Sequence, residues 1–156
     1  MIEQRLEARV IDKLSSALSA VGIDGLQFVG VLQSSEELKA LERGDDSEGL
    51  VVIRTSPRSY SSPTIPTCQI EIEINAIIRA DKDYGGKTYL EVNDAIMRTL
   101  QQWQRCYNDT HEDFTTDDFS CTGFQLGSGT FQFGATSKVW QYTHNMTIFG
   151  VIQFNT

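Results

Sequence analysis

Hydrophobic residues recur along this chain at two spacings, and each spacing predicts its own kind of element. Near the N-terminus, apolar residues follow one another at helical intervals, while charged residues lie largely between them. The stripe consists of Ile2, Leu6, Val10, Leu14, Leu18 and Val21. Gly22 comes directly after it, and glycine commonly ends helices because it adopts left-handed backbone angles without strain. The pattern therefore predicts an amphipathic helix that ends at Gly22.

The second spacing is a strict alternation, which is typical of a β-strand with one buried face. The residues that share the apolar face are Cys68, Ile70, Ile72, Ile74, Ala76 and Ile78. The positions between them are mainly polar and include Gln69, Glu71 and Glu73. Because successive side chains of a strand point to opposite faces, one face of this strand packs on a core and the other meets solvent or a partner. One-sided alternation of this kind favours an antiparallel sheet.

A second long helix is predicted to begin at Thr88. Thr88 and Glu91 have the spacing of a capping box, in which each side chain accepts a hydrogen bond from the backbone of the other. A stripe at helical spacing follows, made of Tyr89, Val92, Asn93, Ile96, Leu100, Trp103 and Tyr107. We expect this helix to lie across the isoleucine face of the sheet. Ser34 and Glu37 repeat the capping pattern and predict a shorter helix that reaches about Arg43.

The remaining patterns complete an α+β fold. Four further strands are predicted, over residues 26–32, 50–55, 119–126 and 138–154, the last with a possible bulge or bend at Gly150. We therefore expect helices packed on one face of an antiparallel or mixed β-sheet. The 156 residues suffice for one domain with a real core, and nothing among them resembles a linker. A single domain over residues 1–156 is the expectation.

A polar stretch over residues 54–67 contains all three prolines of the chain, Pro57, Pro63 and Pro66. Long loops inside compact domains are usually functional or disordered, and this one carries arginine and tyrosine in a chain that is otherwise acidic. We expect an extended loop arm that is presented to a partner, since arginine and tyrosine are enriched in interfaces. Its candidate contact residues are Arg54, Arg58, Tyr60, Pro63 and Ile65. The alternative, in which these arginines are ordinary solvated side chains, stays open.

Charge is unevenly distributed along the chain. The formal net charge of -8 argues against tight, sequence-independent binding of nucleic acid, because such affinity comes from lysine and arginine displacing counterions. Residues 108–118 include five acidic side chains and no lysine or arginine, whereas Lys138 is the one charged residue between Cys121 and Thr156. That last segment is rich in aromatic residues, so either the domain or neighbouring subunits must cover it. No apolar run approaches the roughly 18 residues that a membrane span needs, and we expect none.

No combination of residues predicts catalysis, a metal site or a cofactor. His111 and the acidic residues around it lack the spacing of a zinc or calcium site, so a solvated acidic loop is favoured. His144 lies on the predicted strand face that carries Trp140 and Tyr142, which favours a packed or interface histidine. The three cysteines, Cys68, Cys106 and Cys121, are widely spaced and predict buried free thiols rather than disulfides. We expect a protein that is not an enzyme.

The order of these patterns from Leu50 onward resembles the tail terminator (tail completion) proteins of tailed bacteriophages. The resemblance rests on the run from Pro66 to Ile74, the helix from Leu90 to Leu100 and a strand from Phe119 to Phe124 before a long terminal strand. It implies a small structural protein of the virion, assembled in the host cytoplasm, that forms a six-fold ring on the last ring of the tail tube. Its partners would be other copies of itself, the tail tube protein and the neck or connector, and DNA would pass through without specific binding.

Two alternatives to this function stay open. The first is another head-to-tail connector component, a stopper or an adaptor, which differs only in the surface that its partner contacts. The second is a small cytosolic enzyme or ligand-binding domain that uses the segment from His111 to Asp118 and the aromatic terminal strand as a pocket.

Overall fold

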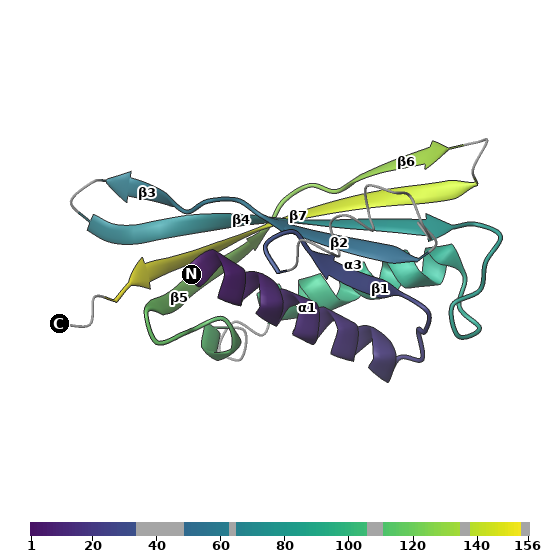
Figure 1. The fold of residues 1–156 in the computed structure, drawn as a ribbon, viewed down its shortest axis with the longest axis horizontal. Helices are drawn as coiled ribbons and strands as arrows, with labels where there is room; N and C mark the ends of the chain where they lie inside the picture. Colours follow the sequence, from purple (N-terminus) through teal and green to yellow (C-terminus); the bar gives the residue numbers. More distant parts are fainter. Residues whose placement is uncertain (34–48, 63–64, 106–110, 135–137, 154–156) are drawn as a thin grey trace.

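The structure, a computed structural model, describes residues 1–33, 49–62, 65–105, 111–134 and 138–153. Its strands are β1 (Gln27–Gly30), β2 (Leu50–Thr55), β3 (Ser59–Ser62), β4 (Ile65–Arg79), β5 (Phe119–Leu126), β6 (Thr130–Gly134) and β7 (Val139–Ile152). They form one seven-stranded sheet, and the helices α1 (Ile2–Ala20) and α3 (Tyr89–Arg105) cover one face of it (Figure 1). β1 is parallel to β2 and the other pairs are antiparallel, so the expected α+β fold with a mixed sheet is confirmed.

Two long antiparallel strands form the middle of the sheet, and each has two short strands along its outer side. β4 pairs with β7 from Thr67 opposite Val151 to Arg79 opposite Val139. Along the other side of β4, β3 pairs with its first half and β2 with its second half. In the same way β5 and β6 pair with the two halves of β7. The short strands fan out toward both ends of the long pair (Figure 1).

The alternation of β4 works as the sequence predicts. Its six apolar side chains, from Cys68 to Ile78, are buried under the helices. The stripe of α1 is buried as well, except that Val21 is 53% exposed because the helix ends at Ala20. Gly22 has a φ of +81°, the left-handed conformation expected of the residue after a helix. On the opposite face of the sheet, Val29, Leu50 and Val52 form a smaller buried cluster.

The predicted capping box of α3 is confirmed. The backbone N–H of Thr88 donates to Glu91 Oε2 at 3.1 Å, and the N–H of Glu91 donates to Thr88 Oγ1 at 3.4 Å. These bonds satisfy two amide groups that have no partner in the first turn of a helix. Of the predicted stripe, Tyr107 lies outside the described residues, as does the helix expected after Ser34.

The stretch over residues 54–67 is not the loop that the prolines suggested. Ser59–Ser62 forms β3, which pairs with the start of β4, so the arm is a β-hairpin. Pro57 precedes β3, and Pro66 has no partner where the register of β3 and β4 shifts. Both positions tolerate the missing N–H of proline, which is why the prolines do not prevent pairing.

Two further differences concern the C-terminal half. Sequence reasoning missed β6, because Thr130–Gly134 is short and glycines precede it in the chain. The expected irregularity at Gly150 lies instead on β5, where the register shifts between Cys121 and Gly123. Gly150 is required for another reason, since a Cβ there would lie 2.2 Å from Phe119 Cζ.

Candidate assembly surfaces

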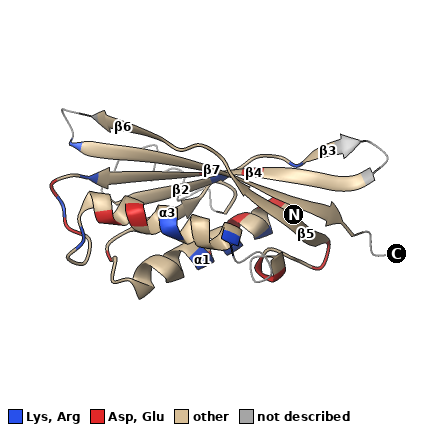
Figure 2. Ribbon diagram, turned by 180° about the vertical axis from the view of Figure 1, so that it is seen from behind, with Lys and Arg blue, Asp and Glu red and all other residues tan. Residues whose placement is uncertain are grey.

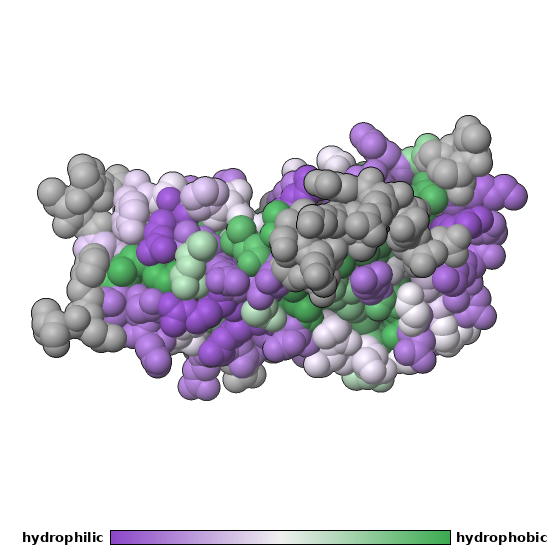
Figure 3. Space-filling model, in the orientation of Figure 1, coloured by the Kyte–Doolittle hydropathy of each residue, from purple (hydrophilic) through white to green (hydrophobic). Residues whose placement is uncertain are grey.

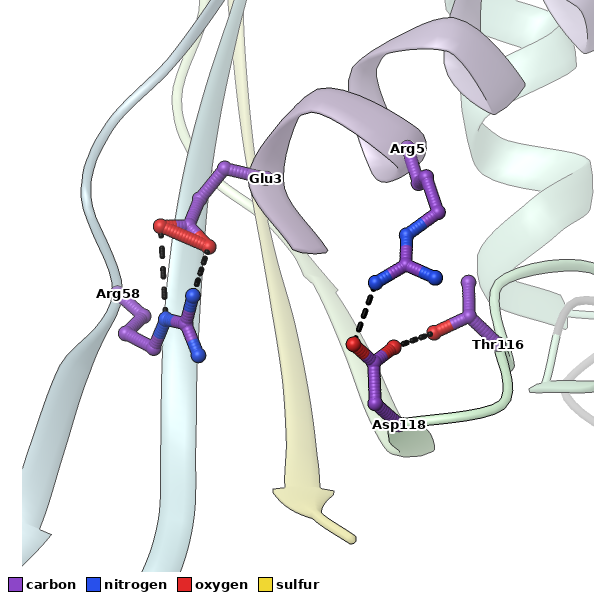
Figure 4. A network of polar contacts seen from close by, with 5 residues as sticks. All are labelled: Glu3, Arg5, Arg58, Thr116 and Asp118. Carbon is purple, nitrogen blue, oxygen red and sulfur yellow. Dashed lines mark hydrogen bonds and ion pairs between the residues drawn. The ribbon is translucent and has the colours of Figure 1, made fainter. Parts of the chain in front are cut away.

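The base of the hairpin formed by β3 and β4 is fastened to the first turn of α1. Arg58 Nη2 lies 2.8 Å from Glu3 Oε1, and Arg58 Nε donates to Glu3 Oε2 at 3.4 Å (Figure 4). Glu3 is 7% exposed, so this carboxylate depends on Arg58 for a partner. Partial burial by itself lowers the pKa of Arg58, but the hydrogen bond and charge of Glu3, with a contribution from Tyr60, raise it above its ordinary value. Arg58 therefore holds the hairpin to the helix.

The other expected contact residues of the arm lie at different places. Arg54 is exposed at the end of β2, opposite Glu73 of β4. Tyr60 is 49% exposed in β3. Ile65 begins β4, where its backbone pairs with Ser62, and Pro63 lies outside the described residues. Of Arg54, Arg58 and Tyr60, whose side chains the structure describes, Tyr60 presents the aromatic surface to a partner.

An aromatic cluster lies at the other end of the sheet, and the candidate residues chosen from sequence did not include it. Phe131 and Phe133 of β6 are 67% and 46% exposed. Their rings pack on Trp140 of β7, with centroids 5.9 and 4.5 Å apart, and Tyr89 at the start of α3 stacks on Trp140 at 5.3 Å. Hydrophobic residues reach the surface beside the β6–β7 hairpin (Figure 3). The sequence did contain a signal for this cluster, because Phe131 and Phe133 are two residues apart in an uncharged run, as in a strand with one apolar face.

The three strands of the C-terminal half, β5, β6 and β7, carry no charged side chain, although Arg79 at the end of β4 and Lys138 before β7 lie at the same end of the sheet as β6. Charged residues lie instead on the helices, the connecting loops and the other strands (Figure 2). An exposed, uncharged aromatic surface is typical of a protein interface, where charged residues are depleted and aromatic residues enriched.

The acidic segment expected to be solvated is bound to α1. Arg5, Arg9 and Lys13 stand one turn apart on the helix and form a basic row. Lys13 Nζ forms an ion pair with Asp113, whose carbonyl accepts a hydrogen bond from Arg9 Nη1 at 2.7 Å. Arg5 Nη2 forms an ion pair with Asp118 (Figure 4). These two carboxylates remain 46% and 35% exposed, as expected of a solvated loop, but each is also paired with a basic residue that is distant in sequence.

Asp118 illustrates how this contact changes a carboxylate. Partial burial by itself raises the pKa of Asp118, but the hydrogen bonds from Thr116 and Arg5 and the charge of Arg5 lower it below its ordinary value. Thr116 Oγ1 donates to Asp118 Oδ1 at 2.9 Å.

Among the described residues there is no group of three or more His, Cys, Asp or Glu side chains that could hold a metal ion.

The remaining candidate chemical groups are built into the core. His144 is 8% exposed and its Nε2 lies 3.0 Å from Asn93 Oδ1, and burial lowers its pKa. Burial has the opposite effect on the Cys68 and Cys121 thiols and raises their pKa, as expected for unreactive free cysteines. Cys106 lies outside the described residues.

Over the part of the chain that the structure describes, no helix has both the length and the apolar character to cross a membrane.

Glu7 is a buried acidic residue that sequence reasoning did not single out. Its side chain in α1 is fully buried, and Oε1 accepts a hydrogen bond from the backbone N–H of Leu32 at 2.8 Å. Gly30, at the end of β1, makes room for it, because a Cβ there would lie 2.5 Å from Oε1. Glu7 therefore fixes the path of the chain as it leaves β1.

Comparison with known proteins adds little to these observations. The sequence matches no protein-family model and no curated protein. Among solved structures, a protein of Akkermansia muciniphila described without its transmembrane region aligns with a TM-score of 0.41 at 11% identity, over 98% of this chain and 86% of that chain. A second protein of Akkermansia muciniphila aligns with a TM-score of 0.39 at 12% identity, over 98% of this chain and 77% of that chain. Similarities this low carry no argument about function.

Proposed function

We propose that this chain is a structural subunit of a tailed bacteriophage that forms a ring at the head-proximal end of the tail tube. In that place it ends the polymerisation of the tube and joins the tail to the neck or connector. The protein acts by assembly rather than catalysis, and the tail tube protein, the connector and further copies of itself are its partners. Its working location is the virion, after assembly in the host cytoplasm.

One observation supports an assembly role above all. The sheet extends to both sides beyond its helix-covered middle, and exposed aromatic side chains lie at both ends, Tyr60 at one and Phe131 with Phe133 at the other. Contiguous exposed apolar patches mark interaction sites, and tyrosine and phenylalanine are among the residues enriched in protein interfaces. A ring subunit needs two such surfaces, because each copy contacts one neighbour on either side.

The pairing of two acidic residues favours assembly over the alternative of an enzyme or ligand-binding domain. The pocket of that alternative would use the segment from His111 to Asp118, in which Asp113 and Asp118 are engaged with α1. The aromatic residues of β6 and β7 pack on one another and on Tyr89. A stopper or adaptor of the connector stays the nearest alternative, since it would use the same kind of surface toward a different partner.

Two measurements test the proposal. Native mass spectrometry over a concentration series, with negative-stain images of the same samples, should reveal rings of six subunits with a central hole. Purified protein added to assembling tail tube protein of the same phage should then shorten and narrow the distribution of tube lengths. A stopper or adaptor would leave tube length unchanged while binding the connector, and that outcome would replace the proposed function.

A further inference from the structure

Each side of the sheet ends in two strands that have one partner in the described part of the chain, β1 and β3 on one side and β5 and β6 on the other. β3 pairs with β4 on one side of the sheet, and β6 pairs with β7 on the other. Within the described residues neither strand has a second neighbour in the sheet. Such an edge presents unpaired N–H and C=O groups that can accept a further strand.

Neither β3 nor β6 contains a charged residue or a proline, although both are short and the register of β3 shifts between Tyr60 and Ser62. Natural edge strands commonly carry lysine or proline to prevent contact with other chains. Because each copy has a formal charge of -8, contact through two uncharged strands also avoids much of the repulsion between copies.

The exposed aromatic residues of both edges lie on the same face of the sheet. Tyr60 stands opposite Cys68, whose side chain is buried on the helix-covered face. Phe131 stands opposite Tyr142, which in turn stands opposite Ala76 of that face. Residues that face each other across strands point to the same side, so Tyr60 and the phenylalanines share a face.

The strand directions fit as well. β3 is antiparallel to β4, and β4 is antiparallel to β7, so β3 runs in the direction of β7. β6 is antiparallel to β7 and therefore antiparallel to β3. A second copy can therefore be placed beside the first in the same orientation. Its β6 then lies antiparallel to β3 of the first copy, and the helices of both copies lie on the same face of the joined sheet. In such a register Ser59 faces Gln132, and Tyr60 faces Phe131.

We propose that β3 of one copy pairs with β6 of the next, so that the sheet continues from subunit to subunit and Tyr60 packs on Phe131 and Phe133. The two contact surfaces differ and lie at opposite ends of the molecule, so the association is head-to-tail and closes into a ring when the rotation between copies permits. This inference rests on the proposed function, for which it names the contact between ring subunits.

Disulfide trapping tests the pairing directly. Ser59→Cys and Gln132→Cys are combined in a chain whose Cys106 is replaced by serine, and the protein is oxidised mildly and run on a non-reducing gel. Covalent dimers and higher multiples are expected. The matched control combines Ser59→Cys with Gln125→Cys, an exposed residue of β5 on the same side of the sheet, and should stay largely uncrosslinked. Equal crosslinking in both proteins, or none in either, overturns the proposal.

Charge substitutions test the aromatic contact independently. Tyr60→Lys and Phe131→Lys should each raise the concentration needed for oligomers roughly ten-fold or more, since an aromatic pair is lost and a charge is buried. Leu90→Lys, at a residue of α3 that is 59% exposed, should leave assembly unchanged. Thermal unfolding of each variant confirms that it is folded.

The outcomes separate this inference from the proposed function. Rings that persist in Tyr60→Lys and Phe131→Lys overturn the β3–β6 contact while leaving a ring subunit in place. If the rings require both Tyr60 and Phe131 but the protein has no effect on tube length, the β3–β6 contact is supported and the terminator role is overturned.

Discussion

The middle of the sheet and its two ends differ in what their side chains do. In the middle, β4 presents isoleucines such as Ile70, Ile72 and Ile74 that are almost completely buried under the helices. At the ends, Tyr60, Phe131 and Phe133 remain exposed on the same face, where the helices do not cover them. The same alternation therefore serves folding in one region and presents contact surface in the other. Under the proposed function, the ends rather than the middle are the surfaces that meet other subunits.

The largest expected effect concerns the buried middle. Ile74→Ala should lower the free energy of unfolding by about 3 kcal/mol, because it leaves a cavity under the helices. Phe131→Ala should lower it by less than about 1 kcal/mol, since most of that side chain already meets water. Urea denaturation of both variants measures the difference. Similar losses would show that the aromatic end is part of the folding core.

A second test concerns close packing where β5 meets β7. Gly150→Ala should cost about 1–3 kcal/mol, because the new methyl group would overlap the ring of Phe119. Gly127→Ala, at an exposed residue where a Cβ would lie 3.3 Å from Asn145 Cβ, should cost less than Gly150→Ala, because Asn145 needs to shift by only a few tenths of an ångström. Phe119→Leu combined with Gly150→Ala should recover part of the loss if overlap is the cause. Thermal and chemical denaturation provide both comparisons.

A smaller effect is expected from the ion pair that fastens the hairpin to α1. In a double-mutant cycle of Glu3→Gln and Arg58→Gln, the coupling free energy should be about 1 kcal/mol, because Glu3 is nearly buried. The exposed pair between Asp94 and Arg98 provides the control, with a coupling of about 0.5 kcal/mol or less. Equal coupling in the two cycles would show that burial gives the hairpin contact no added strength.

The smallest effect concerns pH. Burial holds the pKa of His144 in the folded protein below the value of 6.5 expected for the unfolded chain. Above that pH the residue is neutral in both states and contributes no pH dependence. As the pH falls below 6.5, the unfolded chain takes up the proton more readily, so stability falls until the folded pKa is passed. His144→Gln should remove this part of the slope in denaturation curves measured between pH 7 and about 5.

The sequence predicted the elements whose signals are local. The alternation from Cys68 to Ile78 and the capping box of Thr88 and Glu91 depend on residues close together in the chain, and both are confirmed. β3 and β6 were missed because short polar or glycine-flanked strands have little propensity of their own and form by pairing with a long neighbour. The sequence shows the alternating aromatic residues of β6, but it does not show that Phe131 and Phe133 are exposed.

The sequence by itself determined which segments are amphipathic, where α3 begins and that one face of β4 is apolar, because periodicity and capping act within a few residues. Tertiary structure decided which of the apolar residues are covered. It also brought Arg5 to Asp118, Lys13 to Asp113 and Glu3 to Arg58. Contacts between residues 50 or more positions apart depend on the path of the whole chain, and no local pattern records that path.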